Sequence, residues 1–418
     1  MHPTPQSVGS ATDTDLEELR SRLLRYPVAQ YPVQHAVTRF HLGVRLLQVG
    51  RAAEALPALD AAAAGFTAVG LALELAKAVN MRGVALREVG DLHAAAEAFA
   101  VAATGFAELG QPLEEAAASY NLGLVRRLLG DSDQARSGLL RAMQLFGAAN
   151  LPVQEAAAAR ELGTLLLTDG HPEEAVTVLT TAVSRARDGG DAAGTGAAAN
   201  TLGLAYLAGG TVLDAVGAFR TAAGAHPRSV RPAEHAMAKA NLALAYERQA
   251  APARARLAAG QALAVSDVPA AVRDQAEAVL GRLPPATGAE LFDVLEDEPP
   301  EGWPVVLREE VTRWAECRPA ERAEAAGSWV EGVVLRSGRG PELTEALLNA
   351  VLELPPAAYE RIVEALVRAT SRQPDTAADR FRAVTRSGMA RFPVPQWQRL
   401  AATFERAAER SGNPAGWT

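Results

Sequence analysis

Glycine recurs in this chain every 40 residues, at Gly43, Gly83, Gly123, Gly163 and Gly203, and Ala243 closes the series. A second series follows seven residues later in each unit, at Gly50, Gly90, Gly130, Gly170, Gly210 and Ala250. Self-similarity at a period of about 20 to 50 residues is typical of solenoids, in which each unit buries its apolar face only against its neighbours. The spacing therefore predicts an array of six stacked units over residues 31–267.

Each unit has the pattern of two helices joined by a tight turn, as in residues 116–150. In the first helix Tyr120, Leu124 and Leu128 recur at helical spacing and give one apolar stripe. Gly130 ends that helix, and the Asp131 side chain is placed to cap the free amides of the second helix. The second helix repeats small residues that allow close backbone approach, at Ala55, Ala95, Ala135, Ala175, Ala215 and Ala255. We therefore predict an all-α fold.

These residues also match a known repeat. A Leu-Gly pair such as Leu162–Gly163, a large residue three positions later such as Leu166, and alternating small and large apolar residues in the second helix resemble the tetratricopeptide repeat. The unit is six residues longer than the usual ~34 and lacks the proline that ordinarily ends the second helix, so it most resembles the long repeats of kinesin light chain and LGN-type adaptors. The resemblance implies a right-handed solenoid of helical hairpins.

The regions outside the array have a different pattern. Residues 1–30 are expected to hold a mobile tail, to about residue 12, and a capping helix over 14–26. Residues 268–304 contain a helical stretch that can cap the far end of the array, followed by a proline-rich linker. Residues 305–418 predict a separate and smaller domain of about six helices. All five tryptophans lie in this C-terminal region, where we expect them in the core: Trp303, Trp314, Trp329, Trp397 and Trp417.

Composition excludes several function classes. The net charge of −8 and the pI near 5.5 argue against unaided binding to nucleic acid, which needs a concentrated basic face. The N-terminus lacks the pattern of a signal peptide and no apolar run is long enough to span a bilayer, so we expect a cytoplasmic protein without a membrane contact. The abundance of Ala, Gly and Pro, with lysine only at Lys77 and Lys239, suggests a bacterial source.

No motif for catalysis, metal binding or cofactor binding is evident. H-E-x-x-H, Walker A and G-x-S-x-G patterns do not occur, and a single cysteine, Cys317, rules out an internal disulfide or a Cys-based metal cage. His93 and Glu97 lie four residues apart but make only two of the ligands that a metal site needs. We predict a protein that is not an enzyme and holds no metal or cofactor. The alternative is an active site in a pocket between the two helical domains, around Glu309, Glu310, Cys317 and Tyr359.

Resemblance to the tetratricopeptide family implies that the first helices line a concave binding groove. By position relative to the repeat glycine, the candidate partner-binding residues are Phe40, Asn80, Tyr120, Asn121, Arg160, Asn200 and Asn241, with positive charge added by Lys77, Arg87 and Arg127. An amide offers a donor and an acceptor to the backbone of an extended peptide, and the basic residues favour an acidic or C-terminal carboxylate ligand. The alternatives are that the amides bond to adjacent repeats and that the charges form ordinary intrahelical pairs.

The leading prediction is a scaffold or adaptor that holds a peptide or helix of another protein in this groove. The C-terminal domain would then dock a second partner or mediate homo-oligomerisation. A second reading is a regulatory sensor in which a small molecule or peptide occupies the groove. The third hypothesis is the enzyme or biosynthetic accessory with a site between the domains.

Overall fold

The computed structural model describes residues 6–336, 338–412 and 416–417, with side chains from residue 14 onward. These residues form 21 α-helices and one short 3-10 helix, and they contain no strand. The prediction of an all-α fold is therefore confirmed. The chain divides into two compact units, residues 1–211 (unit 1) and 212–418 (unit 2), and each is described in turn.

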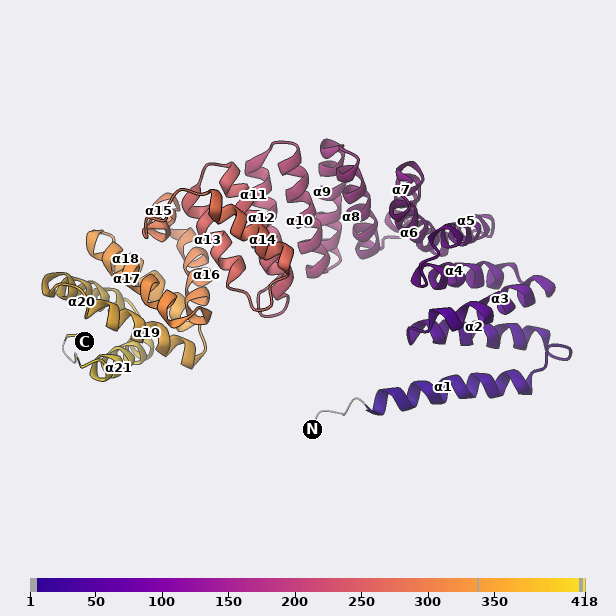
Figure 1. Cartoon of the computed structure of the whole chain (residues 1–418), viewed down its shortest axis with the longest axis horizontal. Coiled ribbons are helices and arrows are strands. Elements are labelled where there is room, and N and C mark those ends of the chain that lie inside the picture. Colours follow the sequence, from indigo (N-terminus) through magenta and orange to yellow (C-terminus); the bar gives the residue numbers. More distant parts are fainter. Residues whose placement is uncertain (1–5, 337, 413–415, 418) are drawn as a thin grey trace. The chain divides into compact units, whose positions relative to one another are not determined.

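Unit 1 is a stack of antiparallel helices in which neighbours in sequence pack against each other (Figure 1). From α2 onward every helix has 17 residues, as expected from a repeat of two equal helices and two short turns. The first helix starts at Gln6, so it takes in part of the predicted tail, while residues 1–5 lie outside the described residues. The helices are α1 (Gln6–Arg25), α2 (Pro32–Gln48), α3 (Ala52–Ala68), α4 (Ala72–Glu88), α5 (Leu92–Glu108), α6 (Pro112–Leu128), α7 (Ser132–Ala148), α8 (Pro152–Thr168), α9 (Pro172–Asp188) and α10 (Ala192–Ala208).

The turn inside each repeat depends on a glycine with positive φ. Gly50, Gly90, Gly130 and Gly170 have φ values between 74° and 88°, a region that residues with a Cβ rarely adopt. The next helix then begins with the predicted cap where an aspartate is present. The Asp91 side chain accepts a hydrogen bond from the Ala94 amide at 3.1 Å. These local interactions fix where one helix stops and the next one starts.

The other glycine series allows the two helices of a repeat to approach closely. A Cβ on Gly123 would lie 2.7 Å from Leu139 Cγ, and one on Gly163 would lie 2.4 Å from Leu179 Cγ. Both leucines are fully buried. The repeating glycine of the first helix therefore makes room for the large apolar residue of the second helix, which explains why this glycine and this apolar residue recur with the same period.

The first helices of the repeats (the A helices α2, α4, α6, α8 and α10) line the inner side of unit 1. Each contacts the next A helix. Successive second helices (the B helices α3, α5, α7 and α9) make no comparable contact among the described residues. Because the A helices are the closer set, side chains on their free faces converge, as on the concave side of a repeat array.

Unit 2 begins with the last helices of the repeat region and continues into the C-terminal helices. The α14 helix packs on both α12 and α13. The predicted domain boundaries at 267/268 and 304/305 stay predictions. The helices of unit 2 are α11 (Val212–Ala225), α12 (Pro232–Arg248), α13 (Pro252–Leu263), α14 (Ala270–Arg282), α15 (Glu290–Asp297), η1 (Pro300–Gly302), α16 (Trp303–Glu316), α17 (Pro319–Leu335), α18 (Gly340–Leu352), α19 (Pro356–Thr370), α20 (Asp375–Met389) and α21 (Val394–Arg410).

The last six helices do not continue the hairpin stack. Their strongest contacts join alternate helices, so α16, α18 and α20 form one layer and α17, α19 and α21 form another. The core between them is rich in aromatic rings, including Trp329 stacked on Phe292 with ring centroids 5.0 Å apart. Four of the five tryptophans are buried, as expected. Trp397 is the exception, because its side chain stands exposed on α21.

Candidate partner-binding face

Nine of the ten predicted partner-binding residues lie on the A helices of unit 1. Eight of them are half-buried, and Asn200 on α10 is buried at 9 % exposure. The remaining one, Asn241, lies on α12 in unit 2. The half-buried residues are Phe40 on α2, Lys77, Asn80 and Arg87 on α4, Tyr120, Asn121 and Arg127 on α6, and Arg160 on α8.

Polar side chains connect successive A helices along this face. Arg87 Nη1 donates to Asn121 Oδ1 at 3.2 Å, which joins α4 to α6. Arg127 Nη2 donates to Glu161 Oε2 at 3.3 Å, which joins α6 to α8. In both pairs the donor stands four residues after a repeat glycine and the acceptor two residues before the next one. The alternative that these amides bond to adjacent repeats thus holds for Asn121, although its partner is a side chain.

Glu161 occupies the same position before its repeat glycine as Asn121, but it was not among the ten predicted partner-binding residues. It is 9 % exposed and also lies 2.7 Å from Arg160 Nη2, so one buried carboxylate accepts from two arginines. Burial, followed by the negative charge of Glu161, raises the pKa of Tyr120. The Tyr120 hydroxyl therefore stays protonated at neutral pH and is available as a hydrogen-bond donor.

The other predicted residues of unit 1 differ in whether their side chains already have partners within the unit. Lys77 pairs with Glu74 at 3.0 Å on its own helix, as the intrahelical alternative expected. Phe40 packs edge-on against buried Phe66, with ring centroids 6.3 Å apart, and belongs partly to the core. The Asn80 Oδ1 atom is buried and has no hydrogen-bond partner among the described residues. An unsatisfied buried acceptor costs free energy, which an added N–H donor would relieve.

The structure does not place Asn241 on an open face. It is 5 % exposed, and Gln275 Nε2 of α14 donates to its Oδ1 at 2.8 Å. The α14 helix takes the position that the next A helix would occupy, and Gln275 stands 34 residues after Asn241, the same separation as between Arg87 and Asn121. The predicted row of amides thus ends before the last repeat.

The four residues proposed for an active site differ in their surroundings, and Glu309 and Glu310 line different pockets. Glu309 lines a pocket, whereas Glu310 is fully buried and is bound by Gln261 and Arg313 at 2.8 Å each. The Tyr359 hydroxyl donates to a backbone carbonyl at 3.3 Å. Burial raises the pKa of Cys317, which disfavours the reactive thiolate.

The described residues give no support for a metal site. His93 and Glu97 are both exposed. No group of three or more His, Cys, Asp or Glu side chains in the described part of the chain is arranged to hold a metal ion. Nor does any helix there have the length and apolarity needed to cross a membrane.

Comparison with protein families agrees with the geometry of the repeats. Two family models, both described as tetratricopeptide repeat, match residues 114–188 and 160–230. Residues 114–230 of the chain therefore match the tetratricopeptide repeat, here in a 40-residue form. Arrays of this class are scaffolds for protein interaction and are typically not catalytic.

Several solved structures are similar to the chain. BtubC (BKLC) from P. vanneervenii is 18 % identical, covering 52 % of this chain and 88 % of that protein, with a TM-score of 0.45. The apo form of RapI is 11 % identical, covering 87 % and 99 %, with a TM-score of 0.46. The apo form of the quorum sensor NprR from B. thuringiensis is 12 % identical, covering 82 % and 99 %, with a TM-score of 0.45. No curated protein matches the chain by sequence.

Proposed function

We propose that the inner face of unit 1 binds an extended segment or a helix of another protein, so that the chain acts as an adaptor. The observation that carries this proposal is the run of half-buried cationic and amide side chains on consecutive A helices: Lys77, Asn80 and Arg87 on α4, Asn121 and Arg127 on α6, and Arg160 on α8. Tyr120 adds a protonated hydroxyl and an aromatic ring in the middle of this row. Aromatic and arginine side chains are the residues that most often dominate binding energy at protein interfaces.

The charge of this face favours an acidic partner. Lys77 is paired with Glu74, Arg127 and Arg160 share the single carboxylate of Glu161, and Arg87 bonds to a neutral amide. These pairs leave positive charge unbalanced on the face, although the whole chain is acidic. Arginine binds carboxylates through two parallel hydrogen bonds, so aspartate, glutamate or a C-terminal carboxylate of the partner fits this surface.

The test compares two double variants in a pull-down from lysate of the native host, quantified by mass spectrometry. Arg87→Gln with Arg160→Gln removes two charges from the face while Glu161 keeps Arg127 as a partner. Arg136→Gln with Arg187→Gln removes two charges from the B helices α7 and α9, where both side chains are exposed. We expect a protein that is captured by the wild type and by the B-helix variant but lost with the inner-face variant.

Capture should also weaken as salt is added, since exposed charge pairs are screened. Equal capture by both variants would contradict the placement of the site on the inner face. Circular dichroism of both variants checks that the helices are retained.

A further inference from the structure

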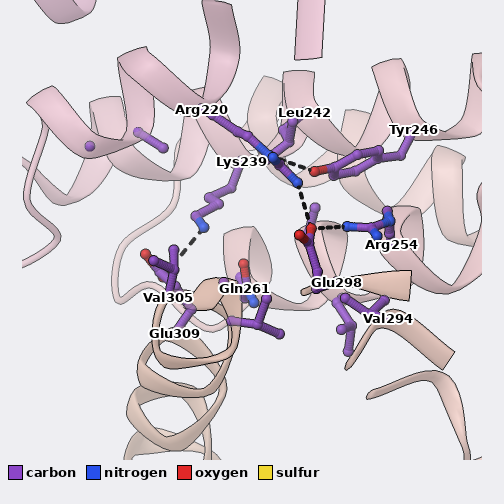
Figure 2. A pocket seen from close by; sticks show the side chains of 16 residues that line it. Arg220, Lys239, Leu242, Tyr246, Arg254, Gln261, Val294, Glu298, Val305 and Glu309 are labelled. Carbon is purple, nitrogen blue, oxygen red and sulfur yellow. Dashed lines mark hydrogen bonds and ion pairs between the residues drawn. The ribbon is translucent and has the colours of Figure 1, made fainter. Parts of the chain in front are cut away.

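A pocket of about 290 Å³ lies within unit 2, between the helices of the last repeats and α15 and α16. Figure 2 shows Arg220 and Lys239 extending into it from one side, and Glu298 and Glu309 from the other. Its volume is just below the roughly 300–1,000 Å³ range of small-molecule sites, so it suits a small ligand or the last residue of a peptide chain.

The polar groups of the pocket carry a surplus of one positive charge. Glu298 Oε1 accepts from Arg220 Nη2 at 3.1 Å and also from Arg254 Nη1, while Arg220 Nε donates to the Tyr246 hydroxyl at 3.0 Å. Three cationic side chains, those of Arg220, Lys239 and Arg254, thus share two lining carboxylates. Asp297 lies 3.9 Å from Arg254, but it is 73 % exposed and compensates little.

Among the charged side chains that line the pocket, Lys239 has the fewest partners within the described part of the chain. Lys239 is 7 % exposed, and among the described residues its ammonium contacts Glu309 Oε2 at 3.4 Å. The same carboxylate oxygen lies 3.7 Å from Nε2 of buried His235. An ammonium has three donors, and a buried charge is costly unless its donors are used. The Lys239 ammonium therefore has donors to spare, and it points into the pocket (Figure 2).

Apart from Gln261, whose amide donates to Glu310 Oε1 at 2.8 Å, the rest of the wall is apolar and lined by small or branched side chains. Ala223 and Leu242 come from the repeat helices, Val294 comes from α15, and Val305 and Val306 come from α16. An apolar wall beside a cation with spare donors is complementary to an amphipathic anion, because the body of the ligand is removed from water while its charge is paired.

We propose that this pocket binds a small apolar group that ends in a single carboxylate, with Lys239 and Arg220 holding the carboxylate. A free branched carboxylic acid and the C-terminal residue of a peptide share this chemistry. The site is separate from the inner face of unit 1 and does not depend on the function proposed for that face.

The experiment uses the full chain labelled with ¹³C at Cε of lysine. Because lysine occurs only at Lys77 and Lys239, the side-chain spectrum has two lysine signals, which a Lys77→Arg variant assigns. The probes are 4-methylpentanoate and an N-acetylated dipeptide ending in leucine, each compared with its amide. We expect a carboxylate probe to shift the Lys239 signal, with Lys77 unmoved and the amides without effect. A response to the free acid, to the peptide or to both identifies the source of the carboxylate.

Calorimetry of the same probes on variants tests the location. Ala223→Leu fills the pocket without removing a charge, and we expect it to weaken binding at least tenfold, as should Lys239→Met. Arg308→Gln removes a neighbouring positive charge on α16 that pairs with Glu353 outside the pocket, and it should change binding less than twofold. The proposal is overturned if no carboxylate binds, if the amides bind equally well, or if Ala223→Leu binds like the wild type with unchanged circular dichroism.

Discussion

Replacing Glu309 by glutamine should destabilise unit 2 because it removes the carboxylate that compensates two buried basic groups. Lys239 is 7 % exposed and His235 is 4 % exposed, and both face Glu309 Oε2, at 3.4 Å and 3.7 Å. Glu309 belongs to α16, and its two basic neighbours belong to α12. The variant leaves the ammonium buried without a counter-charge, the situation in which breaking a pair is most costly.

The size of the effect follows from the pKa of Glu309. Burial alone would raise this pKa, but the adjacent His235 and Lys239 outweigh burial and lower it from 4.5 to about 2. A shift of this size corresponds to about 3 kcal/mol of folding stability, at about 1.4 kcal/mol per pKa unit. Because the side chain is 32 % exposed, screening by water reduces the expected value to about 2 kcal/mol. Since the folded pKa is the lower one, this stability is present above pH 4.5 and is lost as the pH falls toward 2.

The assay is urea unfolding followed by tryptophan fluorescence. All five tryptophans lie between residues 303 and 417, so the signal reports on unit 2. We expect Glu309→Gln to lower the free energy of unfolding by about 2 kcal/mol at pH 7. At pH 3.5 the difference in this free energy between the variant and the wild type should be smaller by about 1 kcal/mol, because Glu309 of the unfolded wild type becomes protonated.

The matched control is Glu353→Gln, which removes an exposed carboxylate from a 2.6 Å pair with Arg308 on the same helix α16. An exposed pair of this kind contributes on the order of 0.2 to 1 kcal/mol. Equal losses in the two variants, or a loss for Glu309→Gln that does not change between pH 7 and pH 3.5, would refute the assignment of Glu309 as a buried counter-charge.

Three further predictions concern stability, measured as melting temperature by circular dichroism. Gly138→Ala should destabilise the fold by about 1 to 3 kcal/mol, because the added Cβ would lie 2.9 Å from the Ser119 carbonyl oxygen. The added Cβ of Gly217→Ala meets no neighbouring atom within 4 Å, so this substitution should stabilise its helix by up to about 1 kcal/mol. Equal melting temperatures of the two variants would contradict this contrast. Ala250 has a φ of 56° where other repeats have glycine, so Ala250→Gly should raise stability by about 0.5 to 1 kcal/mol, and a lower melting temperature would count against backbone strain there. Asp91→Ala should cost about 1 kcal/mol through loss of the helix cap, and an unchanged melting temperature would show that the cap does not contribute.

The repeat architecture was predictable because its determinants are local. Gly130 ends a helix through its own positive φ. Asp131 caps the next helix by accepting from the amide of Gln134, three residues later, and Leu139 fills the space left by Gly123 in the same hairpin. Such interactions recur at fixed offsets, so a period in the sequence is enough to place them. The A-helix positions of the candidate face followed from the same period.

The partners of the polar side chains were not predictable in this way. Whether Asn121 is free depends on Arg87 in the preceding repeat, and whether Asn241 is exposed depends on Gln275 in a helix outside the 40-residue pattern. The pairing of Lys239 on α12 with Glu309 on α16 requires side chains from the repeat region and from the C-terminal helices to meet, which no repeat period specifies. Local pattern therefore specified the helices and their order, while the distances between side chains on different helices, which decide charge pairing and burial, arose only when those helices packed.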